Sequence, residues 1–296
     1  MDLRTLGAFV EVVRQGGFSA AGRALFASQP AVSKAVQQLE EEVGMPLLER
    51  TGHRVRTTTA GDLVYRHALA MLAERDNLRT GLAELGGLKR GRLRLGLSRL
   101  GSSLLFADLV AEFRQRHPGI EIELTEHGSL FLQQALRDGD LDLATCLLPV
   151  PEELDWVLVH DDPLQVLLPE SHPLAGRSSL QLTDLADSPF ILFEQGFALN
   201  PQIQAACQRS GFSPRVAAYS GQAEFIQALV AAGLGVAFLP RLVCQGLRGP
   251  VRGVALDDPE LRWRITLAWR REARLAPAAR AYLEMTRHAL GGGSGR

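Results

Sequence analysis

The sequence predicts an α/β protein with three parts: a helical N-terminal domain, a long helix, and a C-terminal α/β domain built as two halves. Residues 1–57 carry apolar side chains at helical spacing. Residues 58–85 continue as one helical stretch, and a Gly- and Lys/Arg-containing break follows at 86–91. From residue 92 to about residue 290, strands and helices alternate with short turns, which is typical of a parallel α/β sheet.

The composition excludes a disordered chain and a membrane-spanning helix. The 296 residues are 46% hydrophobic and carry a formal net charge of −1, which excludes a chain that is disordered throughout. No run approaches the roughly 18 apolar residues of a transmembrane helix, and the polar N-terminus around Asp2 does not resemble a secretory signal. We therefore expect a cytoplasmic protein. Because the net charge is near zero, any DNA-binding surface must be a local patch.

The sequence carries no pattern of a metal, cofactor or catalytic site. Cys146, Cys207 and Cys244 are far apart and lack CxxC spacing, so we expect buried, reduced thiols. The pair Gly233 and Gly235 follows a helix instead of a strand, which does not fit a dinucleotide site. The chain contains no Gly-x-Ser-x-Gly nucleophile motif. We expect no cofactor and no enzymatic activity.

The first 45 residues predict three short helices. Leu3, Leu6 and Phe9 begin an amphipathic pattern that ends at Gly16. Ser19 is a candidate N-cap for a second helix rich in alanine. The stretch 28–30 (Ser-Gln-Pro) predicts a turn with proline at the first position of a third helix.

The third helix predicts a surface that reads DNA. With Val32, Val36 and Leu39 facing inward, its outer face keeps residues that hydrogen-bond to bases or phosphates: Gln29, Ser33, Lys34, Gln37 and Gln38. Three arginines follow in a stretch that suits a two-stranded wing: Arg50, Arg54 and Arg56. A small helical packing domain with a solvated polar helix is the alternative.

These stretches resemble the winged helix-turn-helix of LysR-type transcriptional regulators. The matching motifs are residues 18–25 (FSAAGRAL), 28–40 (SQPAVSKAVQQLE), 47–50 (LLER) and 59–61 (TAG). The resemblance implies that Gln29, Pro30, Ser33 and Lys34 contact bases and backbone, with Arg50 and Arg54 in or beside the wing. Together with Gln37, these residues are the predicted DNA-binding set.

The long helix predicts dimerisation. Its apolar positions step by four and three residues along a heptad seam, interrupted once by arginine: Val64, Ala68, Met71, Arg75, Leu78, Leu82 and Leu85. Thr58 or Thr59 can cap its start, and Asp62 favours the positive helix end. The alternative is a helix that lies on its own domain. The resemblance implies a homodimer through this helix, a homotetramer through further contacts, and RNA polymerase as a partner.

The C-terminal part resembles the LysR-type effector domain, which has the type 2 periplasmic-binding-protein fold. Three stretches carry the likeness: 113–119 (FRQRHPG), 136–143 (LRDGDLDL) and 230–240 (VAAGLGVAFLP). We predict a DNA-binding domain over 1–57, a linker helix over 58–87 and a regulatory domain over 88–296. Within the last, subdomain I covers about 92–160 and 266–290, and subdomain II about 161–265. The expected elements include helices over about 102–113 and 129–137 and strands near 156–159 and 164–168.

Ligands of such α/β folds gather at the carboxyl ends of strands, between the halves. The loop 98–103 follows a strand and opens a helix, so its amides and hydroxyls suit a carboxylate or other anion. The negative charge of Glu126 would repel an anion at this place, so Glu126 could instead pair with Arg99 or bind an amine. The predicted effector-binding residues are Ser98, Arg99, Ser102, His127, Ser129, Phe193, Gln195 and Gln222.

The predicted function is a DNA-binding transcriptional regulator. It binds an interrupted inverted-repeat operator as an oligomer and responds to a small-molecule effector. An exported solute-binding module would have no use for residues 1–57, and an enzyme would need a reactive constellation that the sequence lacks. Salt-sensitive retention of operator DNA separates the regulator from both alternatives.

Overall fold

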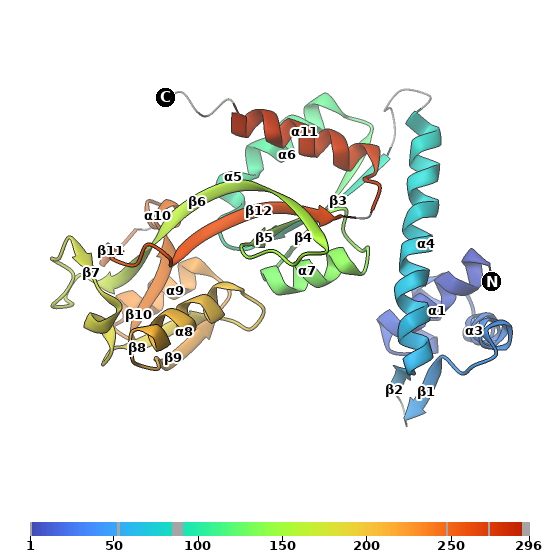
Figure 1. Cartoon of the computed structure of the whole chain (residues 1–296), viewed down its shortest axis with the longest axis horizontal. Coiled ribbons are helices and arrows are strands. Elements are labelled where there is room, and N and C mark those ends of the chain that lie inside the picture. The colour runs from blue at the N-terminus through green and yellow to red at the C-terminus, as the bar shows by residue number, and fades with distance from the viewer. Residues whose placement is uncertain (1, 52–53, 85–90, 247, 272, 292–296) are drawn as a thin grey trace. The chain divides into compact units, whose positions relative to one another are not determined.

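Figure 1 shows a computed structural model of the chain, which describes residues 2–51, 54–84, 91–246, 248–271 and 273–291. The contacts divide the chain into two compact units, Met1–Gly86 and Gly87–Arg296. Each unit has its own buried core. No helix of the described residues is both long and apolar enough to cross a membrane.

The N-terminal unit is a three-helix domain with a two-stranded wing and a fourth, longer helix. Its elements are α1 (Leu3–Gln15), α2 (Phe18–Ala24), α3 (Gln29–Val43), β1 (Leu48–Thr51), β2 (Arg54–Thr57) and α4 (Thr59–Glu84). Asp2 caps α1 by accepting from the amides of Arg4 and Thr5. The predicted cap at Ser19 was wrong: α2 already begins at Phe18, and Gly17 takes the cap position without a side-chain bond.

Helix α4 begins as predicted, and its first half packs against the rest of the unit. The Thr58 hydroxyl accepts from the Gly61 amide at 2.9 Å, which caps the helix. Ala68 is fully buried in the core of this unit, so the first half of α4 lies on its own domain. Further along the seam, Leu78 is 61% exposed. The side chains of Leu82 and Leu85 lie outside the described residues.

The C-terminal unit contains one continuous mixed sheet. Among the described residues its strands follow the order β4-β3-β5-β12-β6-β10-β8-β9, with β11 beside β6 and β7 beside β11. Their bounds are β3 (Gly91–Ser98), β4 (Ile120–His127), β5 (Leu143–Leu147), β6 (Leu154–Pro169), β7 (Ser179–Leu180), β8 (Pro189–Phe193), β9 (Arg215–Ser220), β10 (Val236–Pro240), β11 (Val251–Leu256) and β12 (Arg262–Arg270).

The sheet corrects the expectation of parallel strands. Strands β3, β4 and β5 are parallel, as are β8, β9 and β10, but β12 runs antiparallel to both β5 and β6. The two strands expected near 156–159 and 164–168 are one strand, β6, of 16 residues. The first part of β6 pairs with β12 and its last part pairs with β10 and β11. This strand therefore joins the two halves of the unit.

Helices cover both halves. They are α5 (Ser102–Leu105), α6 (Ala107–Arg116), α7 (Ser129–Arg137), the 3₁₀ turn η1 (Leu182–Leu185), α8 (Leu199–Arg209), α9 (Ala223–Ala231), α10 (Arg241–Cys244) and α11 (Pro277–Gly291). The single helix predicted from 102 through 113 is broken at Phe106, whose side chain is fully buried in the core. The short elements α10, β7 and β11 were not predicted. The break leaves α5 as one turn beside the end of β3.

Candidate functional site

Helix α3 presents the predicted DNA-reading residues on its exposed face. Val32, Val36 and Leu39 are buried against the rest of the N-terminal unit, as the sequence predicted. That burial leaves residues of the opposite face in solvent: Gln29, Pro30, Lys34 and Gln37 are exposed, and Ser33 is half-buried. The helix begins at Gln29 itself, so Gln29 belongs to the helix and not to the turn before it.

The wing is attached to α3 by one carboxylate. Glu40 Oε1 accepts from the backbone amides of Leu47 and Leu48, at 2.7 and 3.1 Å. Strands β1 and β2 then pair antiparallel, with Arg50 opposite Val55. The Arg50 and Arg54 side chains lie outside the described residues. In helix-turn-helix domains the second helix of the motif lies in the major groove. Here that helix is α3, and the Glu40 bonds hold the wing beside its C-terminal end.

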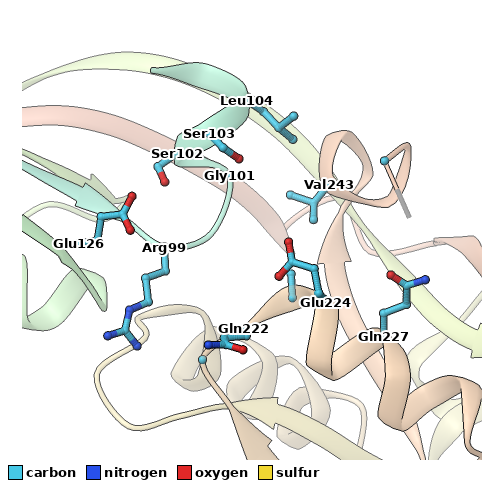
Figure 2. Close-up of a pocket in the computed structure, with 13 residues that line it drawn as sticks. Arg99, Gly101, Ser102, Ser103, Leu104, Glu126, Gln222, Glu224, Gln227 and Val243 are labelled. Atoms are coloured by element: carbon cyan, nitrogen blue, oxygen red, sulfur yellow. The ribbon is translucent and has the colours of Figure 1, made fainter. Parts of the chain in front are cut away.

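The second site is a cavity of about 810 Å³ in the C-terminal unit. Figure 2 shows its walls, which come from the α5 segment, from the end of β4, from the start of α9, and from α10. The lining side chains include two carboxylates, Glu126 and Glu224, and hydroxyl and amide groups. Three predicted effector-binding residues line it: Arg99, Ser102 and Gln222.

The Arg99 side chain forms an ion pair between the two halves of the unit. Its Nη1 donates to Glu194 Oε1 at 2.8 Å, in an ion pair whose side chains are 40% and 43% exposed. Arg99 follows β3 in one half, and Glu194 follows β8 in the other. The partner suggested by the sequence was Glu126. That carboxylate is exposed at the cavity wall and makes no hydrogen bond or ion pair with the residues that the structure describes.

Ser98 and Ser129 lie within the framework of the unit and do not line the cavity. Both side chains are buried. The Ser98 amide donates to Thr145 Oγ1 at 2.6 Å. Ser129 Oγ accepts from the Ala198 amide at 3.1 Å. The latter bond joins α7 in one half to the segment before α8 in the other, so Ser129 makes one of the hydrogen bonds between the halves.

The other predicted residues lie outside the cavity wall. His127 stacks on Phe131, with ring centroids 4.0 Å apart. Phe193 is buried and stacks on Phe197, and Gln195 is exposed. The sequence predicted that residues at the strand ends share one cleft. Alternate side chains of a strand point to opposite faces of the sheet, and Phe193 at the end of β8 points into the core.

Part of the cavity wall was missed because α10 was not predicted. Val243 of this short helix lines the cavity. The helix is anchored by Asp162, which is 1% exposed and lies on β6. Asp162 Oδ2 accepts from the Leu242 amide at 2.6 Å, and its Oδ1 lies 3.4 Å from Arg241 Nε. The anchor is 80 positions away in sequence, and no local pattern could have shown it.

The cysteines are poor nucleophiles. Burial raises the pKa of Cys146 and Cys244 to about 12 and that of Cys207 to about 11, so the thiols are protonated at neutral pH. Cys146 and Cys207 are buried, as predicted, and Cys244 is half-buried. Within the described part of the chain, no group of three or more His, Cys, Asp or Glu side chains is arranged to hold a metal ion.

Comparisons with known proteins identify the domain in each of the two units. Residues 3–62 match the family model of bacterial regulatory helix-turn-helix proteins of the lysR family, and residues 86–291 match the LysR substrate binding domain. The uncharacterized HTH-type transcriptional regulator YwbI of Bacillus subtilis (strain 168) is 36% identical over 98% of this chain and 97% of its own. BudR, an HTH-type transcriptional regulator of Raoultella terrigena, is 33% identical over 96% of this chain and 100% of its own.

Solved structures of full-length regulators have the same fold. A full-length OxyR variant from Pseudomonas aeruginosa aligns with a TM-score of 0.75 and 26% identity, covering 98% of this chain and 94% of its own. Full-length BenM aligns with a TM-score of 0.59 and 27% identity, covering 99% and 97%. The chain therefore belongs to the LysR family of DNA-binding transcriptional regulators, with a helix-turn-helix domain followed by a domain that binds a small-molecule effector.

Proposed function

We propose that the chain works as a homo-oligomer in the cytoplasm, with residues 1–57 reading DNA, 58–87 linking and dimerising, and 88–296 regulating. Two N-terminal units bind the half-sites of an interrupted inverted repeat through Gln29, Pro30, Ser33, Lys34, Gln37, Arg50 and Arg54. Leu78 of the α4 seam is 61% exposed, which supports pairing with a second copy. A tetramer and contact with RNA polymerase complete the proposal, in which the protein changes transcription and catalyses no reaction.

We propose further that the effector binds in the 810 Å³ cavity and presents an anionic group to Arg99. The observation that carries this proposal is the Arg99–Glu194 ion pair between the halves. Among the described residues that line the cavity, Arg99 is the single cation. A carboxylate ligand would compete with Glu194 for it and be supported by the Ser102 and Ser103 hydroxyls. Binding would release the Glu194 loop and shift the relative population of the two arrangements of the halves.

Matched carboxylates and amides test this mechanism. Acetate, succinate and benzoate are titrated against the full chain, with acetamide, succinamide and benzamide as neutral isosteres, and the melting temperature is followed. Glu194→Gln removes the competitor, so the concentration of carboxylate needed for a half-maximal shift should fall about threefold to fivefold, the worth of an exposed ion pair. Arg99→Gln should abolish the shift.

The amides should respond to neither substitution. Carboxylate binding that is unchanged or weakened by Glu194→Gln would show that the anion is not bound at Arg99. The absence of any shift by carboxylates, with operator binding intact, would reject the anionic effector and leave the regulator function standing.

A further inference from the structure

Phe26 lies in the turn between α2 and α3 and is 100% exposed. Its φ angle is +51°, in the left-handed region. Among the described residues no other non-glycine residue has a positive φ. A large aromatic side chain in this conformation is an outlier on two counts, because the backbone is strained and the ring contributes nothing to the core.

The backbone of the turn imposes the conformation. The Phe26 amide donates to the Arg23 carbonyl at 3.2 Å, and the Ala27 amide donates to the Gly22 carbonyl at 2.9 Å. These two bonds form a Schellman motif at the end of α2, in which the left-handed position is usually glycine. A Cβ at Gly22 would lie 2.9 Å from the Ala27 carbonyl oxygen. The chain thus has glycine where the turn is crowded and phenylalanine where the backbone favours glycine.

The position of the turn indicates what the ring contacts. In a helix-turn-helix the first helix crosses the DNA backbone and the second enters the major groove with its N-terminal residues on base edges. The turn between them therefore lies where the groove meets the sugar-phosphate backbone. Phe26 comes two residues before Ser28, the N-cap of α3, and three before Gln29.

We propose that Phe26 is an operator-contacting residue that packs its ring on the apolar groups at the edge of the major groove, the deoxyribose and the thymine methyl. It adds a large apolar contact to a surface made mostly of hydrogen-bonding side chains. The Schellman bonds hold the Phe26 backbone, and with it the base of the side chain, at a fixed place relative to the start of α3. The strain of the free protein is retained because the ring serves the complex and not the fold.

Opposite effects on stability and on DNA binding test this inference. A duplex selected by the wild-type chain from a random pool serves as the operator, and binding and melting are measured on the full chain. Phe26→Asn and Phe26→Gly both accept the left-handed backbone, so the melting temperature of the N-terminal unit should rise by about 3–6 °C. Operator affinity should fall about fivefold to tenfold, the size of one lost apolar contact.

Two further variants serve as controls. Phe26→Tyr keeps the ring and should change neither quantity by much. Leu63→Asn replaces another exposed apolar residue, 51% exposed on α4, and should leave operator affinity unchanged. Operator affinity within twofold of wild type in both Phe26→Asn and Phe26→Gly would overturn the proposal, and so would a fall in melting temperature in both. Because the two variants relieve the backbone independently, a folding defect in one leaves the other to decide.

Discussion

The DNA-reading surface and the effector cavity are built in opposite ways. The residues on the exposed face of α3 come from one helix, at spacings that the helical repeat alone dictates. The cavity is lined by four separate segments, from Arg99 near β3 to Gly246 after α10. A site on one helix is fixed by local hydrogen bonds, whereas a site between segments depends on every contact that positions each of them.

This difference predicts how each site fails. Removing one side chain from α3 removes one contact and leaves its neighbours in place. In the cavity, losses should also come from residues that never touch a ligand, since Asp162 positions α10 and Ser129 bonds one half to the other. The predictions below test this contrast, in order of decreasing expected effect.

Substitution in the α4 seam should cause the largest loss of operator affinity. Each chain carries a complete recognition surface, but tight binding needs two such surfaces linked in a dimer. Leu78→Asp places a carboxylate in the exposed part of the seam, where pairing would bury it unpaired. We expect the operator affinity to fall about 100-fold or more, as two linked heads become independent. Sedimentation and operator titration measure the two quantities.

Leu63→Asp is the matched control, since Leu63 is also exposed on α4 but lies off the seam. It should leave assembly and operator affinity close to those of wild type. Unchanged sedimentation and DNA binding in Leu78→Asp would contradict dimerisation through α4 and would make the recognition surface fully local.

Asp162 tests the claim that the cavity depends on distant anchors. Asp162→Ala leaves the Leu242 amide and the Arg241 side chain without their acceptor. The free energy of unfolding of the C-terminal unit should fall by about 2 kcal/mol, measured by urea denaturation. The neighbouring Asp161 makes an ion pair with Arg262 at 2.6 Å in which both side chains are partly exposed.

Asp161→Ala should therefore lower the free energy of unfolding by less than about 0.5 kcal/mol. Equal losses from Asp161→Ala and Asp162→Ala would show that anchoring of α10 has no special weight, and the contrast between the two sites would lose its basis.

Gln29 tests the local surface and should give the smallest effect. Gln29→Ala removes a side chain that can pair bidentately with adenine, so discrimination between operator and scrambled DNA should fall about tenfold while non-specific affinity stays the same. Gln15→Ala is the control, because Gln15 is exposed at the end of α1, outside the α3 surface, and donates to Glu11 at 2.8 Å. Discrimination retained in Gln29→Ala, or lost equally in Gln15→Ala, would reject the assignment of Gln29.

The sequence by itself determined the helix-turn-helix, the wing and the exposed face of α3, because helical periodicity and turn residues act over a few positions. It also determined most helices and strands of the C-terminal unit, including both ends of α7. The errors in the C-terminal unit concern which neighbouring segments belong to one helix or strand. Two expected strands were one strand, β6, and one expected helix was two, separated by the buried Phe106.

Only the tertiary structure decided which side chains share the cavity. Arg99 pairs with Glu194, 95 residues away, and not with Glu126, although both carboxylates lie at or just after strand ends of the same sheet. Glu224 lines the cavity wall, whereas Phe193, the last residue of β8, is buried in the core. Strand ends can be read from local patterns, but the direction of a side chain after a strand is set by packing between segments, and that information is not local.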